Sequence, residues 1–286
     1  MRALTVGGIW GGYVEKVRHP PVTIKVIAIR RFALTKNKLQ MPQTITHRAG
    51  LTTDGAIAAV IVGAACIAAG WSWAIILIVF FLAGTAVSHT GTKAKRARTG
   101  DVVDKGGPRD SRQVLANGGT FAAAAIASVV WPSHAWQIAG IGAIAASSAD
   151  TWATEIGTLS THSPRSIFRF QPVPPGTSGG VTWLGMCAAF AGAAIVALAA
   201  FLSGWHVSTV CAALIGGFGG SLVDSMLGAS LQLRRWCPQC SSATERRIHT
   251  CGTKTEIAGG IRWLNNDAVN FMSSIAGALI GGVCLP

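Results

Sequence analysis

The chain has 286 residues, of which 50% are hydrophobic and only 12% are charged, and its formal net charge is +13. A soluble domain usually carries about 25% charged residues, so this composition excludes an ordinary soluble globular protein. Glycine is also abundant, with 35 residues, and small residues allow membrane helices to pack closely. We therefore expect an all-α, polytopic bundle of transmembrane helices.

The first 47 residues form a basic extension that precedes the apolar part of the chain. Its stretch "VTIKVIAIRRFAL" is compatible with an amphipathic helix at a membrane surface, with a poorly ordered extension or with a misassigned start. Residues 48–286 are expected to form one integral-membrane domain.

Seven apolar segments follow the extension, and several approach the roughly 20 residues that a helix needs to cross a bilayer. They cover residues 55–70, 73–88, 114–131, 136–159, 183–204, 206–231 and 261–284. The connections "GWSW", "WPSHAW" and "SGWH" are short and uncharged, whereas residues 88–113, 160–182 and 232–260 are long and polar. Lys and Arg collect on the side of the long loops and the N-terminus. The positive-inside rule therefore predicts that this side is cytoplasmic in a multi-pass protein of the cell membrane.

Four acidic residues lie inside the apolar segments, close to their predicted cytoplasmic ends: Asp150, Glu155, Asp224 and Asp267. On a helical wheel, the polar residues around Asp150 share an arc of about 160°, and the segments of Asp224 and Asp267 carry similar stripes. Gly217 and Gly228, on the stripe of Asp224, would let a ligand or another backbone come close. A carboxylate within the membrane is costly unless it is paired, hydrated or metal-bound. The pattern indicates a Mg²⁺ site, a proton or ion pathway, or a structural polar network.

The polar loop before the third apolar segment is rich in Lys and Arg. Arg109, Arg112 or Gln113, and Asn117 are three to four residues apart, so they form one stripe if this part is helical. The planar guanidinium of Arg suits phosphate, and Lys95 adds a further cation. Topogenic charge explains the cluster at residues 95–98 equally well, but it explains Asn117 less well. No nucleic-acid-binding motif accompanies these cations, so nucleic acid is not an expected partner.

A second candidate for phosphate binding is the loop "PVPPGTSGG", residues 172–180. Backbone N–H groups in such loops can bind anions, and Thr177, Ser178 and Gly179 supply hydroxyl and amide donors. Most Pro/Gly loops are only turns. The chain contains no G-x-x-x-x-G-K-[ST] motif, which excludes a P-loop enzyme.

Four residues with the spacing of a zinc site lie in the cysteine-rich loop, residues 232–260: Cys237, Cys240, His249 and Cys251. Three thiolates and one imidazole complete a tetrahedral zinc shell with no open position, so the zinc would be structural. It would stabilise a loop that is too short to have its own core. A thiol pair without metal is the alternative.

Five motifs in this order are shared with one protein family: "RDSRQVLANGG", "SSADTWATEIG", "PGTSGG", "GGSLVDSMLGASLQ" and "GIRWLNNDAVNFMSS". Over about residues 48–286 the chain resembles the integral-membrane family of unknown function that includes the chloroplast phytyl-phosphate kinase of vitamin E biosynthesis. The resemblance implies a catalytic domain that transfers a phosphoryl group from CTP or another nucleoside triphosphate to a polyprenyl monophosphate, giving the diphosphate. The lipid bilayer, the prenyl phosphate and the nucleotide are then the expected partners.

The residue roles for this reaction rest on the chemistry of the side chains. We expect Asp150 and Asp224 to hold Mg²⁺, with Glu155 and Asp267 completing or orienting its shell. The cations expected to bind phosphates are Lys95, Arg109 and Arg112. The nucleotide would also contact Thr177, Ser178 and Gly179. The amides expected to orient oxygens are Asn117, Asn266 and Asn270.

Two other functions fit much of the same pattern. The first is a transporter or channel for a small anion or lipid, which would need polar groups on both sides of the membrane midplane, whereas the acids here lie on one side. The second is a CTP-dependent cytidylyltransferase acting on a lipid phosphate. It uses nearly the same residues, so the sequence barely separates it from the kinase.

Overall fold

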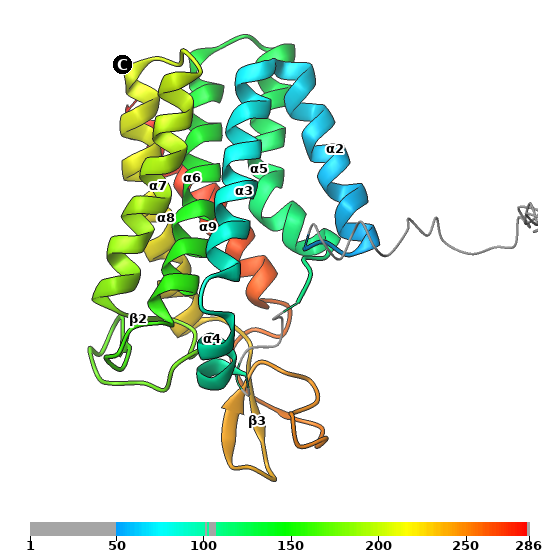
Figure 1. Cartoon of the computed structure of the whole chain (residues 1–286), viewed down its shortest axis with the longest axis vertical. Helices are drawn as coiled ribbons and strands as arrows, with labels where there is room; N and C mark the ends of the chain where they lie inside the picture. Colours follow the sequence, from blue (N-terminus) through cyan, green and yellow to red (C-terminus); the bar gives the residue numbers. More distant parts are fainter. Residues whose placement is uncertain (1–49, 101, 103–106, 285–286) are drawn as a thin grey trace, which may run out of the picture. The chain divides into compact units, whose positions relative to one another are not determined.

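Within the described residues, seven long helices run side by side in a bundle, and each overlaps most of one predicted apolar segment (Figure 1). They are α2 (Thr53–Ala69), α3 (Trp71–His89), α5 (Ser111–Val130), α6 (His134–Gly157), α7 (Trp183–Leu202), α8 (Val207–Ser230) and α9 (Asn266–Gly281), which continues into the 3₁₀ turn η1 (Gly282–Cys284). The predicted all-α bundle of about seven helices is confirmed.

These positions come from a computed structural model that describes residues 50–100, 102 and 107–284. The described residues belong to Gln40–Pro286, one of two compact units of the chain. The predictions for the basic extension, residues 1–47, lie outside the described residues.

Five of the described helices are long and apolar enough to cross a membrane, namely α3, α5, α7, α8 and α9 with η1. Helix α2 is apolar but has only 17 residues. Helix α6 falls outside this set, and its second half carries Ser, Thr and two acids. It is nevertheless the helix with the longest buried stretch, Gly140–Ala149. The chain is thus a multi-pass membrane protein whose central helix carries two acidic residues.

The two ends of the bundle differ in character (Figure 1). At one end the helices are joined by Gly70, residues 131–133 and residues 203–206. At the other end lie the short basic helix α4 (Thr92–Thr99) and all the described strands. We call this second end the polar end.

Capping side chains define where the helices begin at the polar end. Helices α2, α5, α7 and α9 all begin there, and each first turn is capped by a side chain of Thr52, Asp110, Thr182 or Asn265. Such caps satisfy N–H groups that have no partner within the helix. The cap at Asp110 is a full capping box with Gln113, which fixes the rotation of α5 at its start.

The polar segments 160–182 and 232–260 contain short strands. The sequence did not predict these strands. Strand β1 (Arg165–Ser166) pairs antiparallel with β2 (Gly180–Val181). Strand β3 (Arg234–Cys237) lies between β4 (Ser242–Thr244) and β5 (Glu256–Gly259), both antiparallel to it. The cysteine-rich loop is therefore a small three-stranded sheet.

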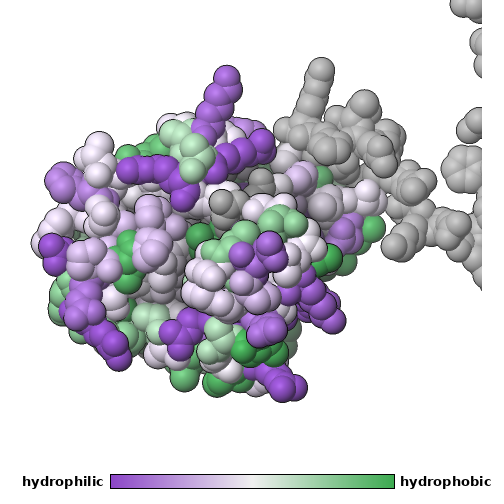
Figure 2. Space-filling model, turned by 90° about the horizontal axis from the view of Figure 1, so that it is seen from below, coloured by the Kyte–Doolittle hydropathy of each residue, from purple (hydrophilic) through white to green (hydrophobic). Residues whose placement is uncertain are grey.

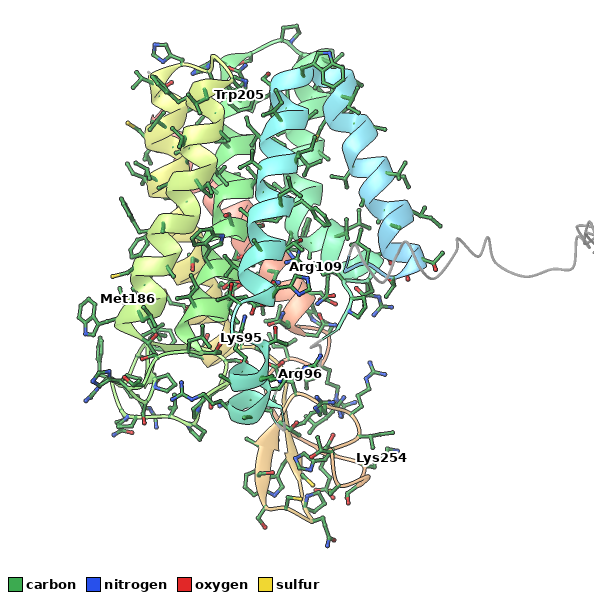
Figure 3. The ribbon with its side chains drawn as sticks, viewed as in Figure 1. Lys95, Arg96, Arg109, Met186, Trp205 and Lys254 are labelled. Carbon is green, nitrogen blue, oxygen red and sulfur yellow. The ribbon has the colours of Figure 1, made fainter. Side chains whose placement is uncertain are left out.

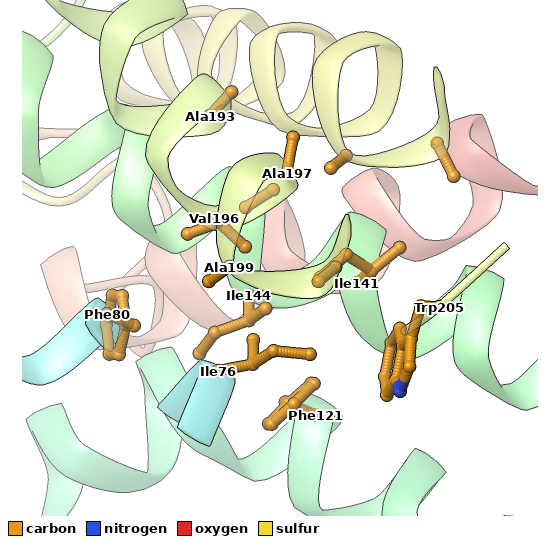
Figure 4. Packing of buried hydrophobic residues seen from close by; sticks show 14 of the residues in the cluster. Ile76, Phe80, Phe121, Ile141, Ile144, Ala193, Val196, Ala197, Ala199 and Trp205 are labelled. Atoms are coloured by element: carbon orange, nitrogen blue, oxygen red, sulfur yellow. The ribbon is translucent and has the colours of Figure 1, made fainter. Parts of the chain in front are cut away.

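The apolar core lies around α6 (Figure 4). Its Ile141 and Ile144 are fully buried against α3 and α7 residues such as Ile76 and Val196. Trp73 packs against Phe121 and Trp205, with ring centroids 5.0 and 4.8 Å apart. In lipid, where apolar side chains gain little from leaving the solvent, van der Waals contact between the helices stabilises this packing.

Glycines bring three helices into direct backbone contact. A Cβ atom added to Gly142 of α6 would lie 2.4 Å from the carbonyl oxygen of Gly277 in α9, and one added to Gly216 of α8 would lie 2.4 Å from the same oxygen. Only a residue without a side chain fits there. Helices α6, α8 and α9 therefore cross with almost no space between them.

Candidate functional site

A cavity of about 1000 Å³ opens at the polar end of the bundle. Its inner wall comes from the ends of α3, α5, α6, α7, α8 and α9. Its outer wall comes from α4, the glycine loop (residues 172–180) and the residues that flank β3 and β4, namely 232–233 and 245–246. Lys95, Arg96 and Arg109 lie at this end in Figure 3, whereas Trp205 lies at the other. Seen from the polar end, hydrophilic side chains are spread over the described surface, as Figure 2 shows.

Most of the residues that the sequence singled out line this one cavity. They are Lys95, Arg109, Asn117, Asp150, Glu155, Thr177, Ser178, Gly179, Asp224, Asn266, Asp267 and Asn270. Arg112 does not line it and is exposed, whereas its neighbour Gln113 does line it. Because α5 begins at Ser111, residues 113 and 117 share a face four residues apart, and Arg112 is turned away by about 100°.

The closeness of Asp150 and Asp224 follows from the glycine contact between α6 and α8. A Cβ added to Gly220 would lie 2.5 Å from the Cβ of Ala146. Both helices run toward the polar end, and the two acids follow this contact by four residues, one helical turn, on the same faces. The two carboxylates are close enough to repel each other electrostatically.

The surroundings of this carboxylate pair contain few compensating groups. The Asp150 carboxylate makes no hydrogen bond or ion pair with the residues that the structure describes. The amide nitrogen of Asn270, in the orientation that satisfies its contacts, donates to Asp224 Oδ2 (3.2 Å) and to the Asn266 carbonyl oxygen (3.1 Å). Two half-buried like charges at this separation need a cation or a shared proton.

Glu155 is not part of this carboxylate pair, because it forms an ion pair with Lys95. The Lys95 ammonium contacts the Glu155 carboxylate and donates to the carbonyl oxygens of Val87 (3.1 Å) and Ser88 (3.2 Å). These three bonds use all three donors of the ammonium group. Lys95 therefore joins α4 to the ends of α3 and α6, with no donor left for a phosphate.

Arg109 is held at the inner wall by the start of α2. Its backbone N–H donates to Gly50 (2.8 Å), and its carbonyl accepts from Thr52 (3.0 Å). Its Nη2 donates to Ser88 Oγ (3.3 Å) beside Gly84, which leaves space for it. Burial lowers the pKa of the guanidinium, and the charge of Glu155 opposes that shift. An arginine remains charged under these conditions, and most of its five donors have no hydrogen-bond partner among the described residues.

The glycine loop is packed against α8. Gly179 has a φ of +75°, and a Cβ added there would lie 2.4 Å from the Cβ of Ala229 and 2.6 Å from the Ser225 carbonyl oxygen. The backbone nitrogen of Gly179 in turn approaches the position that a side chain would take at Gly228. The space predicted at Gly228 is used by another backbone, and the space at Gly217 by Ala145 and Ala193.

The cysteine-rich loop contributes two cavity residues that the sequence analysis missed, Glu245 and Arg246. Glu245 Oε1 accepts hydrogen bonds from Ser178 Oγ (2.7 Å) and from Gln232 Nε2 (2.9 Å). Arg246 donates from Nη2 to the Gly100 carbonyl oxygen (2.9 Å), and its Nε is buried without a partner among the described residues. No periodic pattern links these two residues to the rest of the cavity, so only their charge within the loop could have marked them.

The predicted zinc ligands come together outside the cavity. One ligand atom from each of Cys237, Cys240, His249 and Cys251 lies within 4.8 Å of all the others. This is the one group of three or more such ligands within the described part of the chain. The four acids of the cavity therefore do not form a common ligand set, and Asp150 with Asp224 is the pair that remains.

The opposite end of the bundle has a different lining. A hollow of about 600 Å³ lies there between the α5–α6 connection and the end of α9. It is lined by Val130, Trp131, Pro132, Leu279 and other residues without charge. This hollow therefore lacks the charged lining of the cavity at the polar end.

Comparison with known proteins relates the whole helical domain to one family. The family model described as "Integral membrane protein DUF92" matches residues 41–278. The chain is 31% identical over 255 residues to Protein PGR of Arabidopsis thaliana, covering 79% of this chain and 86% of that protein. It is 32% identical over 213 residues to an uncharacterized membrane protein of Methanocaldococcus jannaschii, covering 74% and 76%. An uncharacterized membrane protein of Synechocystis sp. is 28% identical over 218 residues, 74% of each chain. No solved structure matches.

Proposed function

We propose that this chain, which belongs to the DUF92 family of integral membrane proteins, is a polyprenyl-phosphate kinase. It transfers a phosphoryl group from CTP or another nucleoside triphosphate to a polyprenyl monophosphate, and the product is the diphosphate. The observation that carries the proposal is the composition of the cavity wall: a carboxylate pair, arginines and an apolar strip border one space at the polar end.

The carboxylate pair fits a divalent cation. Asp150 and Asp224 repel each other, and the Asp150 carboxylate has no compensating partner among the described residues. Mg²⁺ is commonly held by one or two carboxylates, with waters and substrate phosphates as its other ligands. Asp150 and Asp224 would hold this ion, which would neutralise charge on the phosphate oxygens. We assign Asn270 to orienting Asp224, with which it shares a hydrogen bond.

The arginines serve the phosphates. Arg109 reaches the cavity from the inner wall, and Arg96 and Arg246 reach it from the outer wall. We assign these three to phosphate binding, in place of Lys95, whose donors are occupied, and Arg112, which lies outside the cavity. Planar guanidinium groups suit the several oxygens of adjacent phosphates. Thr177, Ser178, Gly179, Asn117 and Asn266 remain candidates for nucleotide contacts along the same wall.

An apolar strip of the wall suits the lipid tail. Met186 and Ala189 of α7 and Phe218 and Leu222 of α8 line the cavity on the side of these two helices. A prenyl chain along this strip would leave its phosphate at the polar end and its remaining length in the bilayer. A water-soluble acceptor would have no use for such a strip.

The transfer itself needs little from the protein beyond positioning and charge neutralisation. An oxygen of the acceptor monophosphate attacks the γ-phosphorus and forms a new P–O bond. The bond from the γ-phosphorus to the oxygen bridging it to the β-phosphate breaks, and the nucleoside diphosphate leaves with that electron pair. The acceptor oxygen is already nucleophilic, so no strong general base is required. The arginines hold the two anionic substrates together against their mutual repulsion.

We assign the polar end to the cytoplasmic side of the cell membrane. Nucleoside triphosphates are cytoplasmic substrates, and the basic loops follow the positive-inside rule. The charge-free hollow at the opposite end argues against a pathway for ions through the bundle.

The test is a transfer assay with the purified chain in detergent. Nucleotide labelled in the γ-phosphate, as CTP or ATP, is supplied with Mg²⁺ and with phytyl or geranylgeranyl monophosphate. The expected product is a labelled prenyl diphosphate. No label transfer with any donor and acceptor would contradict the kinase. In a parallel reaction with CTP labelled in the cytosine ring, label in the lipid would indicate a cytidylyltransferase.

A further inference from the structure

We infer that Cys237, Cys240, His249 and Cys251 bind one zinc ion, and that this ion holds Glu245 and Arg246 in the wall of the cavity. The zinc site itself does not depend on the proposed function. Its effect on the cavity wall does not depend on that function either.

The ligand geometry fits tetrahedral zinc. Bond lengths of about 2.3 Å to sulfur and about 2.0 Å to nitrogen imply about 3.8 Å between two sulfur ligands and about 3.5 Å between sulfur and nitrogen. Cys237 Sγ lies 3.6 Å from Cys251 Sγ, and His249 Nδ1 lies 3.3 Å from Cys251 Sγ. A disulfide requires about 2.05 Å between the sulfurs, so all four side chains are available as separate ligands.

The backbone around the ligands forms two similar tight turns. Cys240 is followed by Ser241 with a φ of +50°, and Cys251 is followed by Gly252 with a φ of +85°. A positive φ is unusual for serine, and here it occurs directly after a ligand, as it does at the second turn. The two turns bring the sulfur atoms of Cys240 and Cys251 within 4.8 Å of each other.

The small sheet has no apolar core that could replace the metal. The residues that it buries most are Cys237, Thr244, His249 and Thr255, whereas Trp236, Ile248 and Ile257 are exposed. Strands of three to four residues are too short to be stable without such a core. The bound ion would supply the missing folding free energy, as it does in other small zinc-binding units.

Contacts from the same loop reach three parts of the cavity wall. Glu245 and Arg246 lie in the chain between the two ligand pairs. Glu245 accepts from Ser178 of the glycine loop and from Gln232 after α8, and its backbone N–H donates to the Val102 carbonyl oxygen (2.8 Å). Arg246 donates to Gly100 at the end of α4. Loss of the ion would release all of these contacts together.

The first experiment measures the metal content of the purified full-length chain by inductively coupled plasma mass spectrometry. We expect one zinc per chain, lost in the variant C237S/C240S and retained in the matched variant C187S/C211S, whose thiols lie outside the cluster. Wild-type protein without zinc, or unchanged zinc in C237S/C240S, would overturn the site. If C237S/C240S fails to fold, the wild type is treated with a thiol-specific mercurial, and a colorimetric chelator measures the zinc that is released. We expect one zinc per chain in this measurement as well.

The second experiment measures amide hydrogen exchange in zinc-loaded and chelator-treated protein, without any assay of turnover. We expect exchange at residues 174–180 to become at least about tenfold faster when zinc is removed, because Ser178 loses a hydrogen bond to a charged partner. E245A should keep its zinc and reproduce this change. Faster exchange confined to residues 234–257 would contradict the coupling while leaving the zinc site intact, and neither result depends on whether the chain is a kinase.

Discussion

The carboxylates of Asp150 and Asp224 are the residues on which the proposed chemistry depends most. They lie one turn beyond the contact between Ala146 and Gly220, and that contact fixes the distance between the two helices. A purely structural role would require partners for both acids, and Asp150 has none among the described residues. Its position therefore fits a ligand for a cation better than it fits a structural hydrogen bond.

Replacement of Asp150 tests this interpretation. Asp150→Asn should lower the rate of label transfer by at least about 100-fold, because the carboxylate no longer balances the cation and the phosphates. Thermal stability in detergent should stay the same or rise, since the repulsion between the two carboxylates is removed. Glu256→Gln, at an exposed acid on β5, is the control and should change neither quantity. Wild-type turnover in the Asp150 variant would remove this residue from the site.

Two nearby arginines form a matched pair for a second test. Arg109 lines the cavity and Arg112, three residues later, is exposed outside it. Arg109→Ala should reduce kcat/KM about 10–100-fold through lost phosphate contacts, and Arg112→Ala should stay within about twofold of the wild type. Steady-state kinetics with varied nucleotide measure both. Equal losses in the two variants would mean that overall charge matters and that position does not.

At the scale of the helices, the close crossing of α6, α8 and α9 sets the geometry of the acids. An alanine at Gly142 would push its Cβ against the Gly277 carbonyl, whereas an alanine at Gly63 in α2 would meet no atom within 4 Å. Gly142→Ala should destabilise the bundle by about 1–3 kcal/mol, and it should lower turnover because the acids separate. Gly63→Ala should leave both unchanged. Thermal unfolding in detergent and the transfer assay are the measurements, and equal stability of the two variants would refute the tight crossing.

Sequence patterns predicted the helices well, since apolar length and polar stripes are properties of each segment alone. The same stripes predicted that Asp150, Asp224 and Asn270 would reach one end of the bundle. Partner choice could not be predicted this way. Lys95 looked like a phosphate ligand, but tertiary packing supplies Glu155 and two carbonyl oxygens as its partners.

The remaining misses have equally local causes. Whether Arg112 or Gln113 faces the cavity depends on where α5 begins, and the capping box at Asp110 determines that start. Glu245 lies in a segment whose strands have three to four residues, too few for a period to appear. Its role follows only from contacts with Ser178 and Gln232, which are distant in the sequence.

At the scale of the whole helical domain, the uneven distribution of charge predicts the orientation in the membrane. A cysteine introduced at Ser203, in the α7–α8 connection, should react with a membrane-impermeant maleimide added to intact cells. One introduced at Thr161, in the polar segment after α6, should react only after the cells are permeabilised. Mass spectrometry of the labelled peptides distinguishes both from native thiols. The opposite pattern would invert the proposed orientation.

The short connections opposite the polar end also bear on how the protein enters its membrane. Gly70, residues 131–133 and residues 203–206 contain no Lys, Arg, Asp or Glu. Insertion as three helical hairpins, α2–α3, α5–α6 and α7–α8, would therefore carry only a few uncharged residues across the bilayer at each step. The biogenesis of this protein would then require no translocation of a charged loop, and every charged segment could fold on the side where it was synthesised.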